Sequence, residues 1–218
     1  ILLDLQKILR INLNTIINQN INVIINNRLK QGVRGWSYFP SVIEIAPDID
    51  DLGQIMQMLY KSNNTKYLQD ECFPLVDFVK ENCIQKDGGI LTWLIPIENQ
   101  NSIQKIQKKF NVEKWGEGPD VEAVANLIYS LQLLNNKSYD NLVCNSISYI
   151  LKKQAKQGYW ESRWYFGKYY GTYVSVRCLM EDKGENHLNS IIHASKFIIE
   201  TQNNDGGWGL NNNSSDPL

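Results

Sequence analysis

Three aspartates stand within the five-residue segment PDIDD, which runs from Pro47 to Asp51. An apolar, helix-like run follows at once, so Asp48, Asp50 and Asp51 are expected at a helix N-terminus. One interpretation is capping: Pro47 presets the backbone, and Asp50 or Asp51 accepts hydrogen bonds from the free N–H groups of the first turn. A helix N-terminus also favours anions and lowers the pKa of a nearby carboxyl.

The other interpretation of the same three aspartates is acid catalysis. Neighbouring negative charges and burial both disfavour full ionisation, so crowded carboxyls hold a proton among them. Such a proton can be transferred to an alkene or an epoxide when hydrogen bonds stabilise the carboxylate left behind. The residues alone favour capping over catalysis and leave both interpretations open.

A dense aromatic segment lies near the middle of the second half of the chain. Eight of the 15 residues in YWESRWYFGKYYGTY, from Tyr159 to Tyr173, are aromatic. Ring faces stabilise a cation by about 0.5–2 kcal/mol each at a dry site, and an apolar pocket excludes the water that would quench it. Packing of an aromatic core is the alternative explanation.

The apolar spacing predicts an all-α fold. Apolar residues recur every three or four positions over residues 1–27, 121–134, 173–180 and 188–200, which is typical of helices with one buried face. No segment shows the alternation expected of a strand.

A turn recurs between the helices. Each unit is a helix that ends in Gln, a Gly-aromatic or Gly-Ile turn, a loop and a new helix. The four turns are QGVRGW (31–36), QKDGGI (85–90), QAKQGYW (154–160) and QNNDGGW (202–208). The pattern predicts helical hairpins that must stack to bury their apolar faces. The turns are expected to serve stability: glycine permits the turn, Trp packs between hairpins, and Gln caps backbone groups of a neighbouring helix.

The composition excludes several classes of protein. A net charge of −1 without a basic stripe argues against nucleic-acid binding. The four cysteines form no CxxC pair, which indicates neither a zinc site nor a disulfide framework and is typical of a reducing, cytoplasmic setting. His187 and His193 are six residues apart, whereas two metal ligands on one helix need a spacing of three or four. No run of 18 apolar residues predicts a membrane span.

Taken together, these motifs resemble the terpene cyclase/mutase family, whose members include squalene–hopene and oxidosqualene cyclases. PDIDD is similar to the DxDD motif of class II terpene cyclases, and QNNDGGWG to the family's repeated glutamine–tryptophan motif. GYWESRWYFGKYYGT is similar to the family's aromatic segment. The resemblance covers nearly all 218 residues. It implies an α/α-barrel of helical hairpins, incomplete in this chain, with residues 1–218 forming one domain of a larger two-domain cyclase.

The resemblance also implies roles for particular residues. Asp50 matches the family's general acid, with Asp48 and Asp51 as its supports. A second group would line the cavity or bind the carbocation: Trp164, Tyr170, Tyr169, Phe166 and Asp120. Tyr170 matches a residue of a proton-return network. Where the family often has a histidine four residues after Asp120, this chain has Val124, so the usual support for a strong acid is missing.

The function implied is cyclisation of a linear isoprenoid, squalene-like or another polyprenyl compound, by protonation, ring closure and deprotonation. No cofactor is expected, except Mg²⁺ if the substrate is a diphosphate. The expected partner is the isoprenoid alone, with peripheral membrane contact left open. Two alternatives remain: a non-catalytic binding module, and an inverting glycosidase with two carboxyls about 6.5–9.5 Å apart, for instance Asp50 and Glu122.

Overall fold

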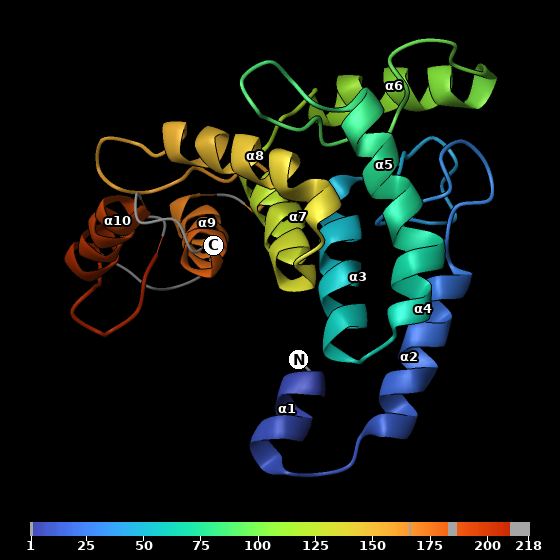
Figure 1. Ribbon diagram of the computed structural model, residues 1–218. Coiled ribbons are helices and arrows are strands. Elements are labelled where there is room, and N and C mark those ends of the chain that lie inside the picture. Colours follow the sequence, from blue (N-terminus) through green and yellow to red (C-terminus); the bar gives the residue numbers. More distant parts are fainter. Residues whose placement is uncertain (1, 166, 183–186, 210–218) are drawn as a thin grey trace. The chain divides into compact units, whose positions relative to one another are not determined.

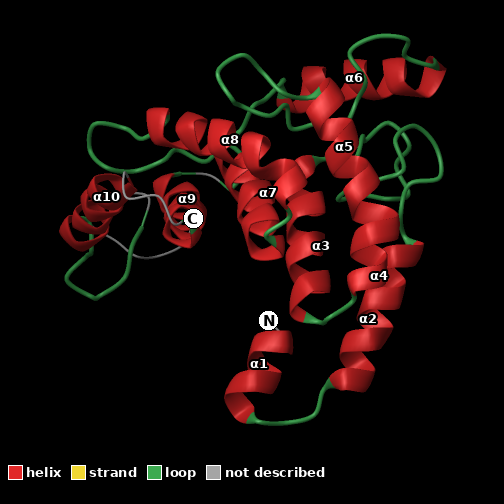
Figure 2. Cartoon of the chain, viewed as in Figure 1, coloured by secondary structure: helices red, strands yellow, loops and turns green. Residues whose placement is uncertain are grey.

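The computed structural model of the protein describes residues 2–165, 167–182 and 187–209. These residues form helices joined by loops, without a strand, and their extended contacts are isolated bridges such as Asp48 with Trp93 (Figure 2). The predicted all-α fold is therefore confirmed. The chain divides into two compact units, one of residues 1–85 and 90–118 and one of residues 86–89 and 119–218.

The first unit contains six α-helices: α1 (Leu2–Leu9), α2 (Asn14–Asn26), α3 (Ile49–Lys61), α4 (Thr65–Tyr67), α5 (Phe73–Asn82) and α6 (Ser102–Trp115) (Figure 1). A π-helical turn, Leu68–Cys72, links α4 to α5. One face of α3 is buried through Ile49, Leu52, Met56 and Leu59, as expected for a helix whose apolar residues recur every three or four positions.

The helix predicted across residues 1–27 is interrupted after α1. Arg10 adopts a left-handed conformation with φ of 53°. Polar side chains then replace helical hydrogen bonds, since Gln6 accepts from the N–H of Leu13 at 2.6 Å and Asn12 accepts from that of Asn14 at 3.0 Å. Asn and Gln compete in this way with the helical backbone, which explains the break within an otherwise periodic segment.

The second unit is built around α7 (Val121–Leu134), which packs against α8 (Asp140–Lys152) and α9 (Lys168–Glu181). Helix α10 (Leu188–Glu200) packs in turn on α9. Nearly every residue from Val121 to Leu131 is buried, because α7 has neighbours on several sides. None of the helices in the described ranges has the length and apolar character needed to cross a bilayer.

The Gly-aromatic turns share one hydrogen bond. The indole Nε1 of Trp36, Trp160 and Trp208 donates to the carbonyl of Ile24, Ile150 and Ile198 respectively, at 2.9, 2.7 and 2.9 Å. Each of these carbonyls belongs to the last turns of the helix that precedes the turn. The tryptophan therefore fastens the turn back onto its own helix.

The glutamine of the third turn reaches a neighbouring helix, as predicted. Nε2 of Gln154 donates to the carbonyl of Gly158 at 2.9 Å and to that of Ser190, in α10, at 2.8 Å. Gln202 makes the equivalent bond within the fourth turn, to Gly206 at 2.7 Å.

Candidate active site

Asp48 caps helix α3. Its Oδ1 accepts a hydrogen bond of 2.8 Å from the backbone N–H of Asp51, and its own backbone is extended. The prediction that the three aspartates stand at a helix N-terminus is confirmed. The prediction that Asp50 or Asp51 is the cap is wrong, because both already lie in the first helical turn, where the side chain is no longer placed to accept from the next turn's N–H groups.

Three backbone hydrogen bonds hold the acidic segment in place. The N–H of Asp48 donates to the carbonyl of Trp36, in the first Gly-aromatic turn, at 3.2 Å. On either side of Asp48, the N–H of Ile49 donates to the carbonyl of Thr92 at 3.0 Å, and the carbonyl of Pro47 accepts from the N–H of Leu94 at 2.8 Å. The start of α3 is thus attached both to the first turn and to the segment that follows the second turn.

The crowded carboxyls have raised pKa values. Burial, followed by the charges of Asp51 and Asp50, raises the pKa of Asp48 well above its usual range, although the N–H of Asp51 acts in the opposite direction. Burial and the charge of Asp50 raise the pKa of Asp51 to about 6. The cluster therefore retains protons at a pH where isolated aspartates are ionised. Asp48 therefore both caps α3 and belongs to the cluster whose pKa values are raised.

Asp50 has a polar partner one helical turn away. Nε2 of Gln54 donates to Oδ2 of Asp50 at 2.8 Å. A hydrogen bond to a carboxylate oxygen stabilises the charged form, so Gln54 stabilises Asp50 as a carboxylate. Our sequence analysis missed this residue, although the i,i+4 spacing on an expected helix could have indicated it.

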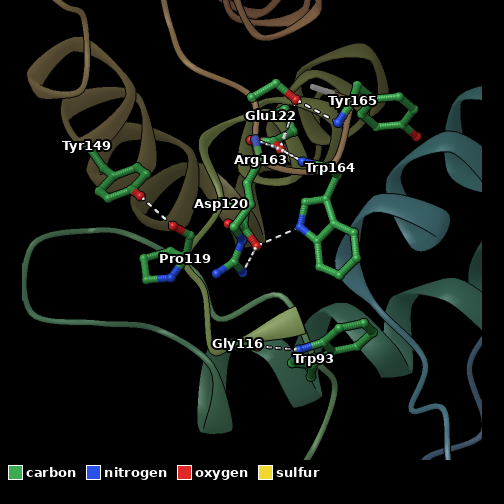
Figure 3. Close-up of polar contacts among 10 residues, drawn as sticks. Trp93, Gly116, Pro119, Asp120, Glu122, Tyr149, Arg163, Trp164 and Tyr165 are labelled. Atoms are coloured by element: carbon green, nitrogen blue, oxygen red, sulfur yellow. Dashed lines mark hydrogen bonds and ion pairs between the residues drawn. The ribbon is translucent and has the colours of Figure 1, made fainter. Parts of the chain in front are cut away.

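A second acidic site lies at the start of α7, in the other unit. Asp120 occupies the N-cap position, but its side chain makes no capping bond. Instead, Oδ2 accepts from Nε1 of Trp164 and from Nη2 of Arg163, both at 2.7 Å (Figure 3). Asp120 is buried, with 6% of its surface exposed. The Arg163 guanidinium compensates this buried charge, and the structure thus joins two predicted site residues, Asp120 and Trp164.

Glu122 holds the same loop by its backbone. Its Oε1 accepts from the hydroxyl of Ser162 at 3.0 Å, from the N–H of Arg163 at 2.8 Å and from the N–H of Trp164 at 2.9 Å (Figure 3). Only 1% of the Glu122 surface is exposed, and this burial raises its pKa. Glu122 Oε1 is therefore occupied by three donors of the loop, which argues against a role for Glu122 as the base that activates water in a glycosidase.

The YGT segment shapes the other side of this loop. Thr172 accepts from the backbone N–H of Trp160 at 3.0 Å. A Cβ on Gly171 would lie 2.6 Å from the carbonyl oxygen of Trp160, so only glycine permits this close approach. Trp160 itself is fully buried, and its indole donates to the carbonyl of Ile150 in α8.

The remaining aromatic candidates have different surroundings. The hydroxyl of Tyr170 accepts from Nδ2 of Asn126 at 3.2 Å, and its ring lies 3.9 Å from that of Tyr165, centroid to centroid. Tyr169 stacks instead on Phe197 of α10, at 5.8 Å. Phe166 lies outside the described residues. Trp164 bonds directly to a predicted acidic residue, Asp120.

Nothing in the described part of the chain groups three or more His, Cys, Asp or Glu side chains in a way that would hold a metal ion.

The family described as the squalene-hopene cyclase C-terminal domain matches residues 18–217. The chain belongs to this family. The family is one of class II terpene cyclases, so the predicted resemblance is confirmed.

Curated relatives match over shorter segments. The chain is 37% identical over 68 residues to the squalene–hopene cyclase of Bradyrhizobium diazoefficiens, which covers 31% of this chain and 10% of that protein. It is 26% identical over 62 residues to a labda-7,13-dienyl diphosphate synthase of Streptomyces clavuligerus, covering 28% and 11%. The relatives are thus cyclases and synthases of terpenes.

Solved structures share the fold. A variant of the type II terpene cyclase MstE from Scytonema, in complex with geranylgeranyl dihydroxybenzoate, superposes with a TM-score of 0.64 at 16% identity over 91% of this chain and 52% of that chain. A second variant, without ligand, gives 0.58 at 18% identity over 85% and 47%. The chain therefore has the helical fold of these cyclases and spans about half the length of the solved chains.

Proposed function

We propose that the protein is a class II terpene cyclase in which Asp50 protonates a linear isoprenoid. The observation that carries the proposal is the crowding of three carboxyls at the start of α3, where burial and mutual repulsion raise the pKa of Asp48 and of Asp51. Membership of the cyclase family supports it. A cluster that keeps a proton near neutral pH is the property a protonating enzyme needs.

In the proposed reaction, the electron pair of a terminal double bond takes the proton of Asp50 and forms a C–H bond, or an epoxide oxygen takes that proton and opens. The resulting carbocation is attacked by the next double bond, and ring closure continues along the chain. Loss of a proton from the last cation ends the reaction, so the product is an isomer of the substrate. The amide of Gln54, 2.8 Å from Oδ2, stabilises the Asp50 carboxylate in the meantime.

The aromatic residues that match the family's cavity residues are proposed to stabilise the cations. Trp164 is the first candidate because the bond of its Nε1 to Asp120 fixes the ring. Tyr170 is the second, held by Asn126. Tyr169, which stacks on Phe197, is assigned a packing role beside them.

The substrate class is a linear polyprenyl compound. Val124, where the family often has a histidine, is fully buried and apolar, so it cannot strengthen the acid by a charge or a hydrogen bond. An epoxide or an alkene activated by the shape of its pocket is therefore favoured over an unassisted alkene. No cofactor takes part, and Mg²⁺ is needed only if a diphosphate group must be bound.

The test is to incubate the whole protein with C15 to C30 isoprenoids, supplied free, epoxidised and diphosphorylated, and to identify products by mass spectrometry. Asp50→Asn keeps the size of the side chain but cannot donate this proton, so it should abolish cyclisation. Asp70→Asn, a change at an exposed aspartate of the same unit, is the matched control and should remain active. Cyclic product from the Asp50 variant would contradict the mechanism. No product from the wild type with any substrate would favour a binding module.

A further inference from the structure

Glu122 is a buried carboxyl to which the proposed proton transfer gives no task. A carboxyl with 1% of its surface exposed carries a large desolvation cost unless hydrogen bonds compensate it. All three donors that reach its Oε1 belong to consecutive residues of one loop: Ser162, Arg163 and Trp164. The carboxyl therefore acts on the loop that carries the candidate cation-binding ring.

Two carboxyls at the start of α7 hold Trp164 at two points, its backbone N–H and its ring Nε1. Glu122 accepts from its backbone N–H at 2.9 Å, and Asp120 accepts from its ring Nε1 at 2.7 Å. Both acceptors stand at the start of α7, where Asp120 is the N-cap and Glu122 belongs to the first turn. A tryptophan side chain has two rotatable bonds, so fixing its backbone and the far edge of its ring leaves a single orientation.

The two carboxyls divide this work. Asp120 binds the indole edge and is neutralised by Arg163, whose guanidinium lies 2.7 Å away. Glu122 has the loop as its partner, and its Oε1 accepts all three hydrogen bonds from it. Without Glu122, two backbone N–H groups and the Ser162 hydroxyl would lose a common acceptor, and the base of the Trp164 side chain would no longer be fixed.

We propose that Glu122 is a positioning residue that fixes the orientation of the Trp164 ring, the candidate for cation stabilisation. This inference rests on the proposed cyclase function. Cation–π attraction is directional, because only the ring face carries the negative potential. A ring that turns away lowers the rate of ring closure and exposes the cation to water, while binding of the substrate before its protonation is little affected. Loss of Glu122 should therefore act on kcat and on the product mixture rather than on KM.

Three variants test the proposal. Glu122→Ala removes the acceptor, whereas Glu122→Gln retains a carbonyl oxygen for the same three donors. Ser146→Ala is the stability control: it removes a buried hydrogen bond of 2.9 Å, from Ser146 to the carbonyl of Gly88, in the same unit. Each variant is measured well below its unfolding temperature for kcat, KM and products, and the exchange of the Arg163 and Trp164 amide hydrogens is followed by NMR or mass spectrometry.

The expected result is a roughly tenfold fall in kcat for Glu122→Ala, with KM within about twofold and more open-chain or hydroxylated product. Its amide hydrogens at 163 and 164 should exchange at least about tenfold faster. Glu122→Gln should restore most of both properties, and Ser146→Ala should lower the unfolding temperature without changing the products.

Two results would overturn the proposal. The first is a rate of amide hydrogen exchange at residues 163 and 164 that is the same in Glu122→Ala as in the wild type. This result would overturn the proposal even if the wild type proves inactive. The other is faster exchange with an unchanged kcat and product mixture. An inactive wild type contradicts the proposed function itself and with it the catalytic part of this inference, while the exchange experiment still decides whether Glu122 positions the loop.

Discussion

The indole Nε1 of Trp164 donates a hydrogen bond of 2.7 Å to Oδ2 of Asp120, and both residues were candidates of the sequence analysis. They are 44 residues apart in the chain. The bond ties the aromatic segment to the start of α7. It also means that the ring and the carboxyl are one structural feature, so a change at either residue alters the other.

Replacing Trp164 tests its proposed contribution to cation stabilisation. Trp164→Phe keeps a ring face but loses the bond to Asp120, so a part of the activity should remain. Trp164→Ala loses both, and each ~1.4 kcal/mol of lost transition-state stabilisation lowers the rate about tenfold. Measured kcat values for cyclisation should therefore fall in the order wild type, Phe, Ala. Equal activity of all three proteins would remove Trp164 from the mechanism.

The ion pair between Asp120 and Arg163 should contribute to stability. Arg163→Ala leaves Asp120 buried without its cation, and because the Arg163 side chain is 42% exposed the loss should be about 1–2 kcal/mol, below the cost seen for fully buried pairs. Urea denaturation measures it. Asp120→Asn combined with Arg163→Ala should be less destabilised than the sum of the single changes, since the unpaired charge is gone. Strict additivity would show that the pair contributes nothing.

The raised pKa of Asp51 predicts a pH dependence of stability. A carboxyl with a pKa of about 6 in the folded protein and about 3.9 in the unfolded chain binds its proton more tightly when folded. Its contribution to stability is fully present below about pH 4 and is lost as the pH rises to about 6. The pKa of Asp48 is shifted in the same direction.

Asp51→Asn should therefore reduce the fall in the free energy of unfolding between pH 4 and pH 6. The check is a series of urea denaturation curves for wild type, Asp51→Asn and the control Asp70→Asn. The control should follow the wild type. If Asp51→Asn shows the same pH dependence as the wild type, the carboxyl of Asp51 does not hold a proton in this range.

Much of the fold follows from short-range pattern. The apolar spacing of residues 121–134 and 188–200 predicted α7 and α10, and the Gln-to-Trp turns predicted where hairpins end. These features depend on residues within one or two helical turns of each other, so they can be read locally. The break at Arg10 could not be predicted in this way, because the same apolar spacing continues on both sides of it. The end of the helix depends instead on hydrogen bonds made by the side chains of Gln6 and Asn12.

The candidate site was only partly predictable for the same reason. The cluster after Pro47 is visible as a motif, but its cap depends on which residue is extended, and Asp48 has φ of −132°. Glu122 was considered as a glycosidase base. Its real partners lie 40 to 42 residues further along the chain, and no periodicity connects them. That contact requires the packing of a loop onto α7, which the sequence pattern does not encode locally.

Gln54 should support the acid. Gln54→Leu keeps a helix-forming side chain but removes the donor 2.8 Å from Oδ2 of Asp50, so the carboxylate formed on proton transfer is less stable. A hydrogen bond to a charged group contributes about 1.5–3 kcal/mol when buried. Gln54 is exposed, so a loss of about threefold to tenfold in kcat is expected. Gln54→Glu puts a like charge beside Asp50 and should lower kcat further. Gln57, on the same helix, is buried, so its replacement would not be a suitable control. A kcat unaffected by either change at Gln54 would exclude the role.

The third and fourth turns offer a matched pair for testing how hairpins stack. Gly158 and Gly206 have positive φ, 99° and 83°, and the N–H of each donates to the residue three positions earlier, at 2.8 and 2.9 Å. Their surroundings differ. A Cβ on Gly158 would lie 2.4 Å from the backbone oxygen of His193 in α10, whereas a Cβ on Gly206 meets no described atom within 4 Å.

Both substitutions by alanine carry the strain of a left-handed backbone, about 1–2 kcal/mol. Gly158→Ala must also push α10 away from the turn, and overpacking of this kind adds about 1–3 kcal/mol. It should also weaken the bond of Gln154 to Ser190, because that bond joins the same turn to the same helix. The free energy of unfolding should therefore fall by about 2–5 kcal/mol for Gly158→Ala and by about 1–2 kcal/mol for Gly206→Ala. Thermal or urea denaturation of the two variants decides it, and equal losses would show that strain within the turn, rather than its contact with α10, makes glycine necessary at Gly158.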